Sequence, residues 1–315
     1  MSSPLPAGNE AAHVGALGGG AGGPRPLSDR HFRYLSPWLA VFVAIWIVGL
    51  LVLAPNAAAL VRDNWVFIPI GAAGAILGNI SAVGGGIVFI PTMIFLFHFP
   101  PVAALKIALA TQSLGMTSGA IGWLQKKVVP LRALRIALPG LLLGSSISSF
   151  VIHPSALLLK ALFGPVSILL GCLTLVLARR ARPEAMRTDI PEDARWPLLL
   201  AAMLGGAITG WIAIGEGELV AALLLLVYRV DPRMAIGFGV VLLSINSIFL
   251  TLAHQLFLGG IPWDYAAFTG LGAVFGARLA PWVSRRFSPR TLSTLFAAVA
   301  IGDGAIFILQ YFLAR

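Results

Sequence analysis

Two short glycine-rich stretches within otherwise apolar sequence are the first candidates for ligand binding. They are Gly84–Gly86 and Gly215–Gly217. Glycine lets the backbone leave a helix, and unwound backbone at membrane depth is tolerated only against protein or a water-filled cavity. The helical arms that begin near Ile87 and Glu218 would point their amino termini at these breaks, and such termini favour oxyanions. The alternative interpretation is that the glycines only permit close helix packing.

Ionisable side chains within the apolar runs are the next candidates, because charge is costly in lipid. Lys106, near Gln112, could supply positive charge to an anion or reach the outer interface. Glu216 and Glu218 oppose a bare anion, so we expect them to pair with Lys106 or Arg278, or to act as protonatable groups for coupling. The candidate substrate-binding residues are Asn79, Ser81, Gly84, Gly85, Gly86, Lys106, Gln112, Gly215, Glu216, Gly217 and Asn246, and the coupling candidates are Glu216, Glu218 and Asp303.

The remaining polar residues and motifs give weaker signals. His98, His153 and His254 lie at the ends of apolar runs, where an interfacial imidazole is the simplest interpretation. Asn246 and Ser244 could line a pore or only form hydrogen bonds between helices. The sequence contains no HExxH, GxSxG, Walker A or cysteine–histidine cluster. It therefore predicts neither an enzyme nor an ATP-driven pump, and no cofactor or metal.

The composition requires a lipid environment. Of 315 residues, 58% are hydrophobic and 11% are charged, and the mean hydropathy is +0.91, which leaves too little polar surface for a water-soluble protein. The formal net charge is +10, but the basic residues lie in short clusters between apolar runs, as in cytoplasmic loops. The lipid bilayer is therefore an expected partner, and nucleic acid is not.

Apolar runs long enough to span or enter a membrane occupy most of the chain. Residues 1–33, rich in Gly, Ala and Pro, are expected to form a disordered tail, and residues 34–315 a transmembrane domain. Tyr34–Leu53 is expected to be an uncleaved signal-anchor helix. Further runs lie at about 65–80, 87–98, 101–124, 131–152, 156–178, 197–214, 218–228, 233–257, 264–283 and 291–312.

The two halves of this domain come into register after a shift of about 131 residues. The positions that coincide are Gly84–Gly86 with Gly215–Gly217, Ala104 with Ala235 and, after one residue of slippage, Gly140 with Gly272 and Gly144 with Gly276. Short apolar runs agree easily by chance, whereas an ordered set of glycines does so less easily. We therefore predict an internal duplication with repeat one at about 65–178, a cytoplasmic loop at 179–195 and repeat two at about 196–312.

The Lys and Arg clusters indicate how each half enters the membrane. If each glycine-broken pair of short helices returns to the side where it entered, nearly all basic clusters fall on one face, with the N-terminus cytoplasmic. If each pair crosses once, the clusters divide between both faces. The first arrangement, in which each pair is a hairpin, agrees better with the distribution of basic residues. It predicts an all-α polytopic membrane protein of two inverted repeats. Each repeat would be a glycine-broken helical hairpin plus three transmembrane helices, with one extra N-terminal transmembrane helix.

The glycine-rich stretches also resemble a known family. Gly78–Pro91, followed by Ala104, resembles the signature of the TauE/SafE sulfite exporter family, also called DUF81 permeases. The second half repeats the pattern as Gly210–Glu218, with Ala235–Gly237 at the matching distance, and Gly272–Ala280 resembles the small-residue helix that follows in family members. The resemblance covers about residues 65–312.

Three departures bear on the substrate. Ala82 stands where a family glycine is common, Glu216 replaces the middle glycine of the second copy, and Ala222 replaces a proline that would match Pro91. The resemblance implies export of a small anionic substrate, such as sulfite, a sulfonate or sulfoacetate, across the bacterial cytoplasmic (inner) membrane. The departures leave the particular anion open.

The predicted function is secondary transport of small anions by alternating access, with proton coupling as an option. A passive anion channel and a membrane assembly or scaffold protein are the alternatives, and flux against a gradient separates a carrier from a channel. The sequence does not determine the coupling ion, the direction of transport or the oligomeric state, so a homo-oligomer is one option.

Overall fold

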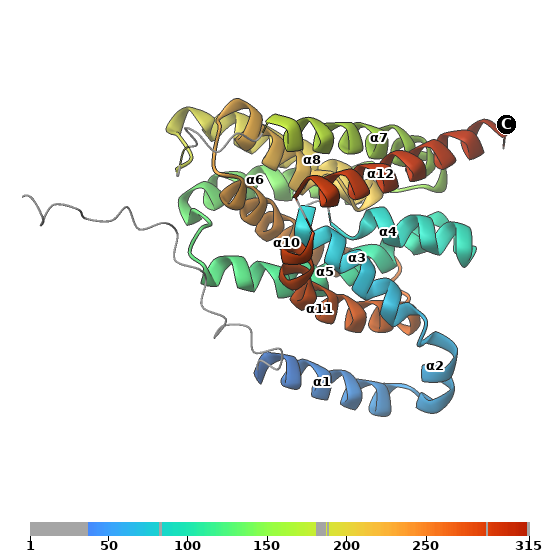
Figure 1. Cartoon of the computed structure of the whole chain (residues 1–315). Helices are drawn as coiled ribbons and strands as arrows, with labels where there is room; N and C mark the ends of the chain where they lie inside the picture. Colours follow the sequence, from blue (N-terminus) through green and yellow to red (C-terminus); the bar gives the residue numbers. More distant parts are fainter. Residues whose placement is uncertain (1–36, 82–83, 181–186, 188, 288, 314–315) are drawn as a thin grey trace, which may run out of the picture. The chain divides into compact units, whose positions relative to one another are not determined.

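The computed structural model describes residues 37–81, 84–180, 187, 189–287 and 289–313 (Figure 1). The predicted disordered tail, residues 1–33, lies outside them. Residues 42–315 form one compact unit, and the helix contacts, the site and the cavities discussed below lie within it. Apart from one isolated bridge between Arg187 and Val230, the regular structure of the described residues is helical. The predicted all-α class is confirmed.

Six described helices are long and apolar enough to cross a membrane, and a bent pair, Pro37–Val52 with Ala57–Asn64, would add a seventh. The six are Leu131–Val151, Ala156–Leu177, Glu192–Ile212, Pro232–Phe257, Trp263–Val283 and Thr291–Phe312. A multi-pass membrane protein is therefore the architecture that the described part of the chain supports.

The helices follow the predicted apolar runs closely. Before the repeats come α1 (Pro37–Leu53) and α2 (Ala57–Asn64), a short helix that the apolar runs did not predict. Repeat one contains α3 (Phe67–Ser81), α4 (Gly86–Pro91), α5 (Pro101–Gln125), α6 (Leu131–Ser146) and α7 (Ala156–Arg180). Repeat two contains α8 (Arg195–Ile212), α9 (Glu216–Ala222), α10 (Pro232–Phe257), α11 (Trp263–Arg286) and α12 (Pro289–Leu313).

The backbone shows the same shift of 131 residues as the sequence. Positive φ angles occur at Gly84 (+86°) and at its match Gly215 (+114°). They recur beyond the two short arms, at His98 (+57°) and at its match Arg229 (+53°). Both arms also end in a π-helical turn, Thr92–Leu96 after α4 and Leu223–Val227 after α9. The two repeats therefore share backbone features that their side chains do not reveal.

Each of the main helix pairs joins a helix of one repeat to a helix of the other. Helix α3 packs against α11, and its counterpart α8 packs against α6, while α5 pairs with α10 and α7 with α12 (Figure 1). Glycines permit these contacts, because a Cβ atom there would collide with a backbone carbonyl oxygen of the facing helix. The pairs are Gly272 with Ile68, Gly276 with Ala72, Gly140 with Leu199 and Gly144 with Met203. The facing residues are again 131 positions apart.

Each glycine-broken pair returns to the end of the bundle where it began. The ring of Phe67, at the start of α3, lies 4.7 Å from that of Phe97, beyond the first arm. In the second repeat, the hydroxyl of Tyr228, beyond the arm, donates to the carbonyl oxygen of Asp193, just before α8, at 3.4 Å. Both pairs are therefore helical hairpins.

The open ends of the two hairpins, where the chain enters and leaves each one, lie at opposite ends of the α5–α10 pair. At one end, which we call the basic end, are Lys126, Arg132, Arg187, Arg229 and Arg233. The other, the aromatic end, holds Phe97, Phe99, Tyr265, Phe257 and Trp211.

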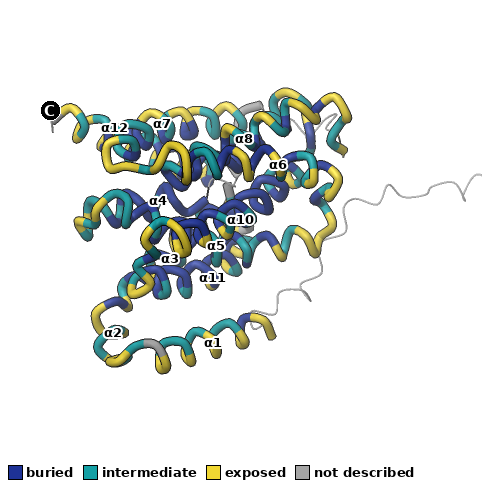
Figure 2. The backbone as a smooth tube through the Cα atoms, turned by 180° about the vertical axis from the view of Figure 1, so that it is seen from behind, coloured by how far each residue is buried: buried dark blue, intermediate teal, exposed yellow. Residues whose placement is uncertain are grey.

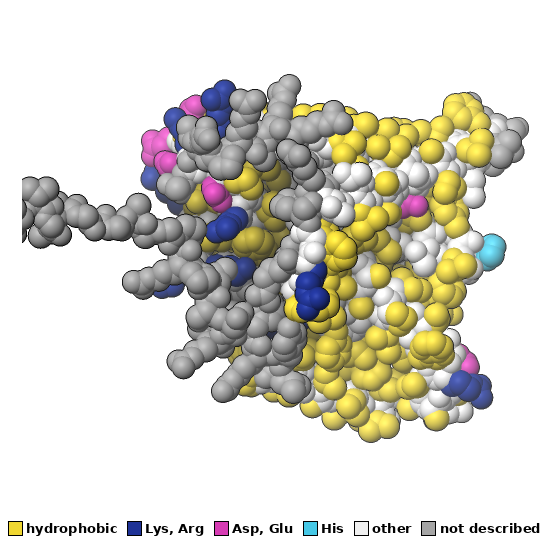
Figure 3. All heavy atoms as spheres, viewed as in Figure 1, with side chains coloured by type: hydrophobic (Ala, Val, Ile, Leu, Met, Phe, Trp, Pro, Cys, Tyr) yellow, Lys and Arg dark blue, Asp and Glu magenta, His cyan; other side chains and the backbone are white. Residues whose placement is uncertain are grey.

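A hydrophobic belt separates these two ends. Figure 3 shows hydrophobic side chains over most of the visible surface between the ends, with only isolated charges within the belt. Figure 2 shows that α5 and α10 are buried along much of their length at the centre of the bundle. Charged residues at two ends, an apolar belt and a buried central pair are what a bilayer-spanning bundle requires.

Candidate functional site

The two glycine breaks meet at the middle of α5, where Gln112 links them. The Gln112 side-chain amide donates from Nε2 to the carbonyl oxygen of Ala213 in the second break, at 2.6 Å. Its Oε1 accepts a hydrogen bond from the Ser247 hydroxyl on α10, at 3.3 Å. On the side of the first break, Gly84 lies against the same amide, since a Cβ added there would be 3.3 Å from Oε1. The structure thus brings both predicted breaks to one residue.

The glycines of the first break have different structural roles. Gly84 has a φ of +86°, so its backbone has left the helix and favours glycine. Gly86 instead permits contact between the breaks, because a Cβ atom there would overlap the carbonyl oxygen of Ala213. Packing therefore accounts for Gly86, whereas true unwinding accounts for Gly84 and for Gly215 in the second break. The packing interpretation therefore holds for Gly86, whereas ligand binding at the unwound positions stays a prediction.

The second break contains a buried carboxylate held by a chain of polar side chains. Oε2 of Glu216 accepts a hydrogen bond from Nδ2 of Asn246, and Oδ1 of Asn246 accepts one from the Ser145 hydroxyl at 2.5 Å. The Glu216 N–H donates to the Thr209 hydroxyl at 3.2 Å, and this hydroxyl donates to the carbonyl oxygen of Ile214 at 3.2 Å. Oε1 of Glu216 has no partner among the described residues. That oxygen is free to carry a proton.

The ion pairs that were one of two expectations for the glutamates do not form between described residues. Nζ of Lys106 donates to the carbonyl oxygen of Leu258 at the aromatic end, at 2.5 Å. Nε of Arg278 donates to the Ser118 hydroxyl on α5, at 3.2 Å. The ion pairs found in the described part of the chain, Arg62–Asp63 and Arg132–Glu192, are exposed. The pairing expectation is wrong for this conformation because both basic groups are engaged elsewhere.

The other two coupling candidates have different surroundings. Glu218 is buried, and neither of its carboxylate oxygens forms a hydrogen bond of normal geometry with a described residue. Asp303 is partly buried on α12, next to Gly304, which packs closely against Gly164 of α7. No ion pair joins Asp303 to any described residue. Glu218 therefore shares the second break with Glu216, whereas Asp303 lies on α12 beside a glycine of the α7–α12 contact.

Two candidates from α3 are less directly placed. Nδ2 of Asn79 donates to the carbonyl oxygen of Ala75 at 2.9 Å, and its Oδ1 lies against Gly119 without a hydrogen-bond partner among the described residues. Ser81 is the last residue of α3, and its side chain lies outside the described part of the structure. The close constellation thus consists of the two glycine breaks, Gln112 and Asn246, with Lys106 set apart.

The sequence interpretation missed a polar stripe on α10. His254, expected at an interface, is only 1% exposed, and both its ring nitrogens lack a hydrogen-bond partner among the described residues. The hydroxyl of Thr251, one turn earlier, is also buried and unpartnered. Ser244, Ser247, Thr251 and His254 follow one another at spacings of three, four and three, which places them on one helical face. This spacing is the feature of the sequence that could have revealed the polar stripe.

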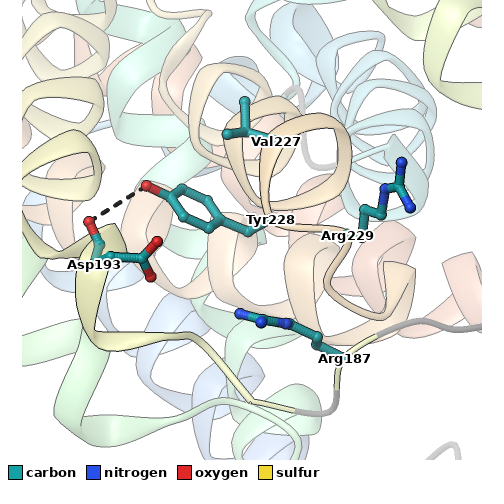
Figure 4. Close-up of a pocket in the computed structure, with 5 residues that line it drawn as sticks. All are labelled: Arg187, Asp193, Val227, Tyr228 and Arg229. Carbon is teal, nitrogen blue, oxygen red and sulfur yellow. Dashed lines mark hydrogen bonds between the residues drawn. The ribbon is translucent and has the colours of Figure 1, made fainter.

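A separate pocket lies at the basic end, at the open end of the second hairpin. Its volume is about 550 Å³, and it is lined by Arg187, Asp193, Val227, Tyr228 and Arg229 (Figure 4). The Arg187 N–H donates to the carbonyl oxygen of Arg229 at 2.8 Å, so Arg187 is held against the open end of the second hairpin. In Figure 4 the side chains of Arg187 and Arg229 point in different directions. None of the predicted site residues lines this pocket.

Comparisons with known proteins agree with this geometry. The sequence matches the family described as "Sulfite exporter TauE/SafE" over residues 67–305. It is similar to two proteins of Bacillus subtilis (strain 168). "Probable membrane transporter protein YunE" is 23% identical over 270 residues, 78% of this chain and 97% of that protein. "Probable membrane transporter protein YjnA" is 24% identical over 253 residues, 73% of this chain and 94% of that protein.

No solved structure matches this chain. The family match spans both glycine-broken hairpins and the α5–α10 pair that joins them. The chain belongs to the TauE/SafE sulfite exporter family.

Proposed function

We propose that this membrane transporter is a secondary carrier that exports small sulfur-containing oxyanions, such as sulfite, sulfonates or sulfoacetate, by alternating access. The observation that carries this proposal is the meeting of two broken hairpins at Gln112 in the middle of the bundle. Broken helices that meet near the midplane between repeats are a recurring arrangement of substrate sites in secondary carriers. The family membership supports the class of substrate.

The proposed topology is an inverted repeat with the basic end in the cytoplasm. The open ends of the hairpins lie at opposite ends of the α5–α10 pair and support opposite orientation of the repeats, and the gathering of Lys and Arg at one end supports the cytoplasmic assignment. Single-cysteine labels in the loops at 126–135, 179–195 and 285–290 should all react from the cytoplasmic side only. A label that reacts from outside would contradict this topology.

We further propose proton coupling through the second break. Glu216 is buried next to a neutral partner, Asn246, and has one oxygen free. A carboxyl group in that setting can be neutral when an anion is bound and charged when it is not, which would link the two binding events. Glu218, buried in the same arm, is the second candidate for this role.

Reconstituted protein gives the decisive test of the function. Purified chain in liposomes should accumulate radiolabelled sulfite or sulfoacetate against its concentration gradient when a proton gradient is imposed. Taurine, sulfate and small carboxylates, offered as competitors, would define the anion class. Flux that only ever runs down the gradient would instead support the anion channel. A chain that moves none of these anions would overturn the proposal.

A further inference from the structure

The α5–α10 contact differs in chemistry between its two ends, on either side of a centre where Gln112 bonds Ser247 and Thr117 bonds Ser244 at 2.8 Å. From Gln112 toward the aromatic end, the residues on the contact are polar, and we call them the polar seam: Gln112, Ser247, Thr251, His254 and Lys106. The residues 131 positions away form the apolar seam toward the basic end: Leu243, Met116, Ala120, Trp123 and Gly237. Every polar residue of one half is thus matched by an apolar residue or glycine in the other. Two related repeats would not need this difference for packing alone.

The middle of the polar seam is buried and lacks partners. Ser247 is satisfied by Gln112, but one turn further the Thr251 hydroxyl has no hydrogen-bond partner among the described residues. At the next turn the same holds for both ring nitrogens of His254. The two residues are 7% and 1% exposed. Buried polar atoms are nearly always hydrogen-bonded, so unpaired ones need an explanation such as a ligand.

The polar seam ends at a cavity that carries a positive charge. Lys106 lies within electrostatic range of His254 and also lines a cavity of about 300 Å³ together with Gly259 and Gly260. Its ammonium group donates one hydrogen bond, to Leu258, which leaves two of its three N–H groups available. No carboxylate is among the described residues that line this cavity. The charge and the donors therefore suit an anion.

We infer that Lys106, Thr251 and His254 form a second oxyanion-binding site, between the glycine breaks and the aromatic end of the bundle. The lysine supplies charge, and the hydroxyl and one imidazole N–H supply donors. The choice of sulfur oxyanions as probes rests on the proposed function, whereas the site itself rests on the burial, the missing partners and the cavity. The apolar seam offers no such site toward the basic end.

Cysteine labelling at the cavity tests the site without relying on transport. Ala103 lines the cavity, and the native thiol can be removed with Cys172→Ser, so Ala103→Cys provides one reporter. The negatively charged sulfonatoethyl methanethiosulfonate should label it about tenfold faster than the positively charged trimethylammonioethyl reagent, after normalisation to Ser155→Cys, which is exposed just before α7. Sulfate or sulfoacetate should slow this labelling in a saturable way. Sulfite is unsuitable because it cleaves the mixed disulfide.

Two variants assign the effect to the proposed residues. Lys106→Met should remove the preference for the anionic reagent, while Lys160→Met, which removes the same charge from partly exposed Lys160 in the first turns of α7, should keep it. His254→Phe should weaken protection by sulfate and sulfoacetate at least about tenfold while Lys106 still attracts the reagent. His254→Gln, which keeps a donor, should restore part of the protection. Folding of each variant is checked by its elution as a single detergent-solubilised species.

The outcomes separate this site from the proposed function. Absence of saturable protection in a chain that transports anions in liposomes would overturn the second site alone. Equal labelling by both reagents would overturn it as well. Saturable protection that depends on Lys106 and His254 would support the site even if no anion were transported, and in that case only the proposed function would fail.

Discussion

The two glycine breaks share a backbone but differ in chemistry. In the second break, Glu216 accepts a hydrogen bond from Asn246, which in turn accepts one from Ser145. The matching positions are Gly85 and Gly115 in the first repeat and, for Ser145 after one residue of slippage, Ala277 in the second. The polar network takes Glu216 and Asn246 from the second repeat and Ser145 from the first, and each of the three corresponds to a small residue at the matching position. Gln112, the polar residue that links the breaks, belongs to the first repeat and is matched by Leu243 in the second.

Under the proposed mechanism, this difference separates the features that both breaks need from those that one break can supply alone. Alternating access needs two hairpins of similar shape, and both breaks retain the positive φ that allows the backbone to unwind. A coupling group is needed only once, because one protonatable side chain can serve a single central site. Placing carboxylates in both breaks would also double the charge that repels a bound anion. The comparison therefore indicates that both breaks need the same backbone geometry, whereas only the second needs an ionisable side chain.

The largest expected effect comes from adding a methyl group where the breaks touch. In Gly86→Ala the new Cβ would overlap the carbonyl oxygen of Ala213, so the breaks must separate, at a cost of about 1 to 3 kcal/mol in stability and with loss of transport. Gly122→Ala is the control, because nothing lies within 4 Å of a Cβ at Gly122. Anion uptake into liposomes and thermal unfolding measure both effects. Normal uptake by Gly86→Ala would show that contact between the breaks is dispensable.

The next effect concerns the charge that only the second break carries. Glu216→Gln mimics the protonated carboxyl group and can still accept a hydrogen bond from Asn246, so we expect anion binding to persist while transport loses its dependence on pH and on the proton gradient. Glu192→Gln, at an exposed ion pair, provides the matched change in charge. Unchanged pH dependence in Glu216→Gln would direct attention to Glu218 or Asp303.

A smaller effect is expected when the first repeat is made to resemble the second. Gln112→Leu introduces the residue found at the matching position 243 and removes the hydrogen bonds to Ala213 and Ser247. Each lost bond is worth about 0.5 to 1.5 kcal/mol, so we expect the apparent affinity for the anion to fall roughly tenfold. Ser113→Ala on the same helix, whose hydroxyl bonds only its own helix, serves as the control. Affinity equal to wild type would remove Gln112 from the site.

The smallest effect is expected at the far end of the polar network. Ser145→Ala removes the donor to Asn246 but leaves the hydrogen bond between Asn246 and Glu216 in place. We expect a loss of about 0.5 to 1.5 kcal/mol in the free energy of unfolding and a modest change in the pH dependence of transport. Ser146→Ala, the neighbouring residue outside the network, should be close to neutral. A loss as large as that of Gly86→Ala would mean that Ser145 does more than orient Asn246.

The sequence predicted the helices and both hairpins because these depend on local properties. The boundaries of α5 and α10 fall within a residue of the predicted runs, since hydropathy and proline mark where such helices begin. Glycine spacing located both breaks and the shift that relates them, because a backbone that leaves the helix requires glycine locally. The π-helical turns at the ends of both arms were not predicted, as no residue type marks them.

The sequence by itself therefore determined which segments enter the membrane, where they break, and which residues are chemically suited to an anion. Only the tertiary structure decided which of these residues meet. Asn246 reaches Glu216 and Lys106 reaches Leu258 across separations of 30 and 152 residues in the chain. His254 is buried because α5 covers its face of α10. Such contacts depend on how the helices cross and rotate against one another, and packing across the whole bundle sets that geometry.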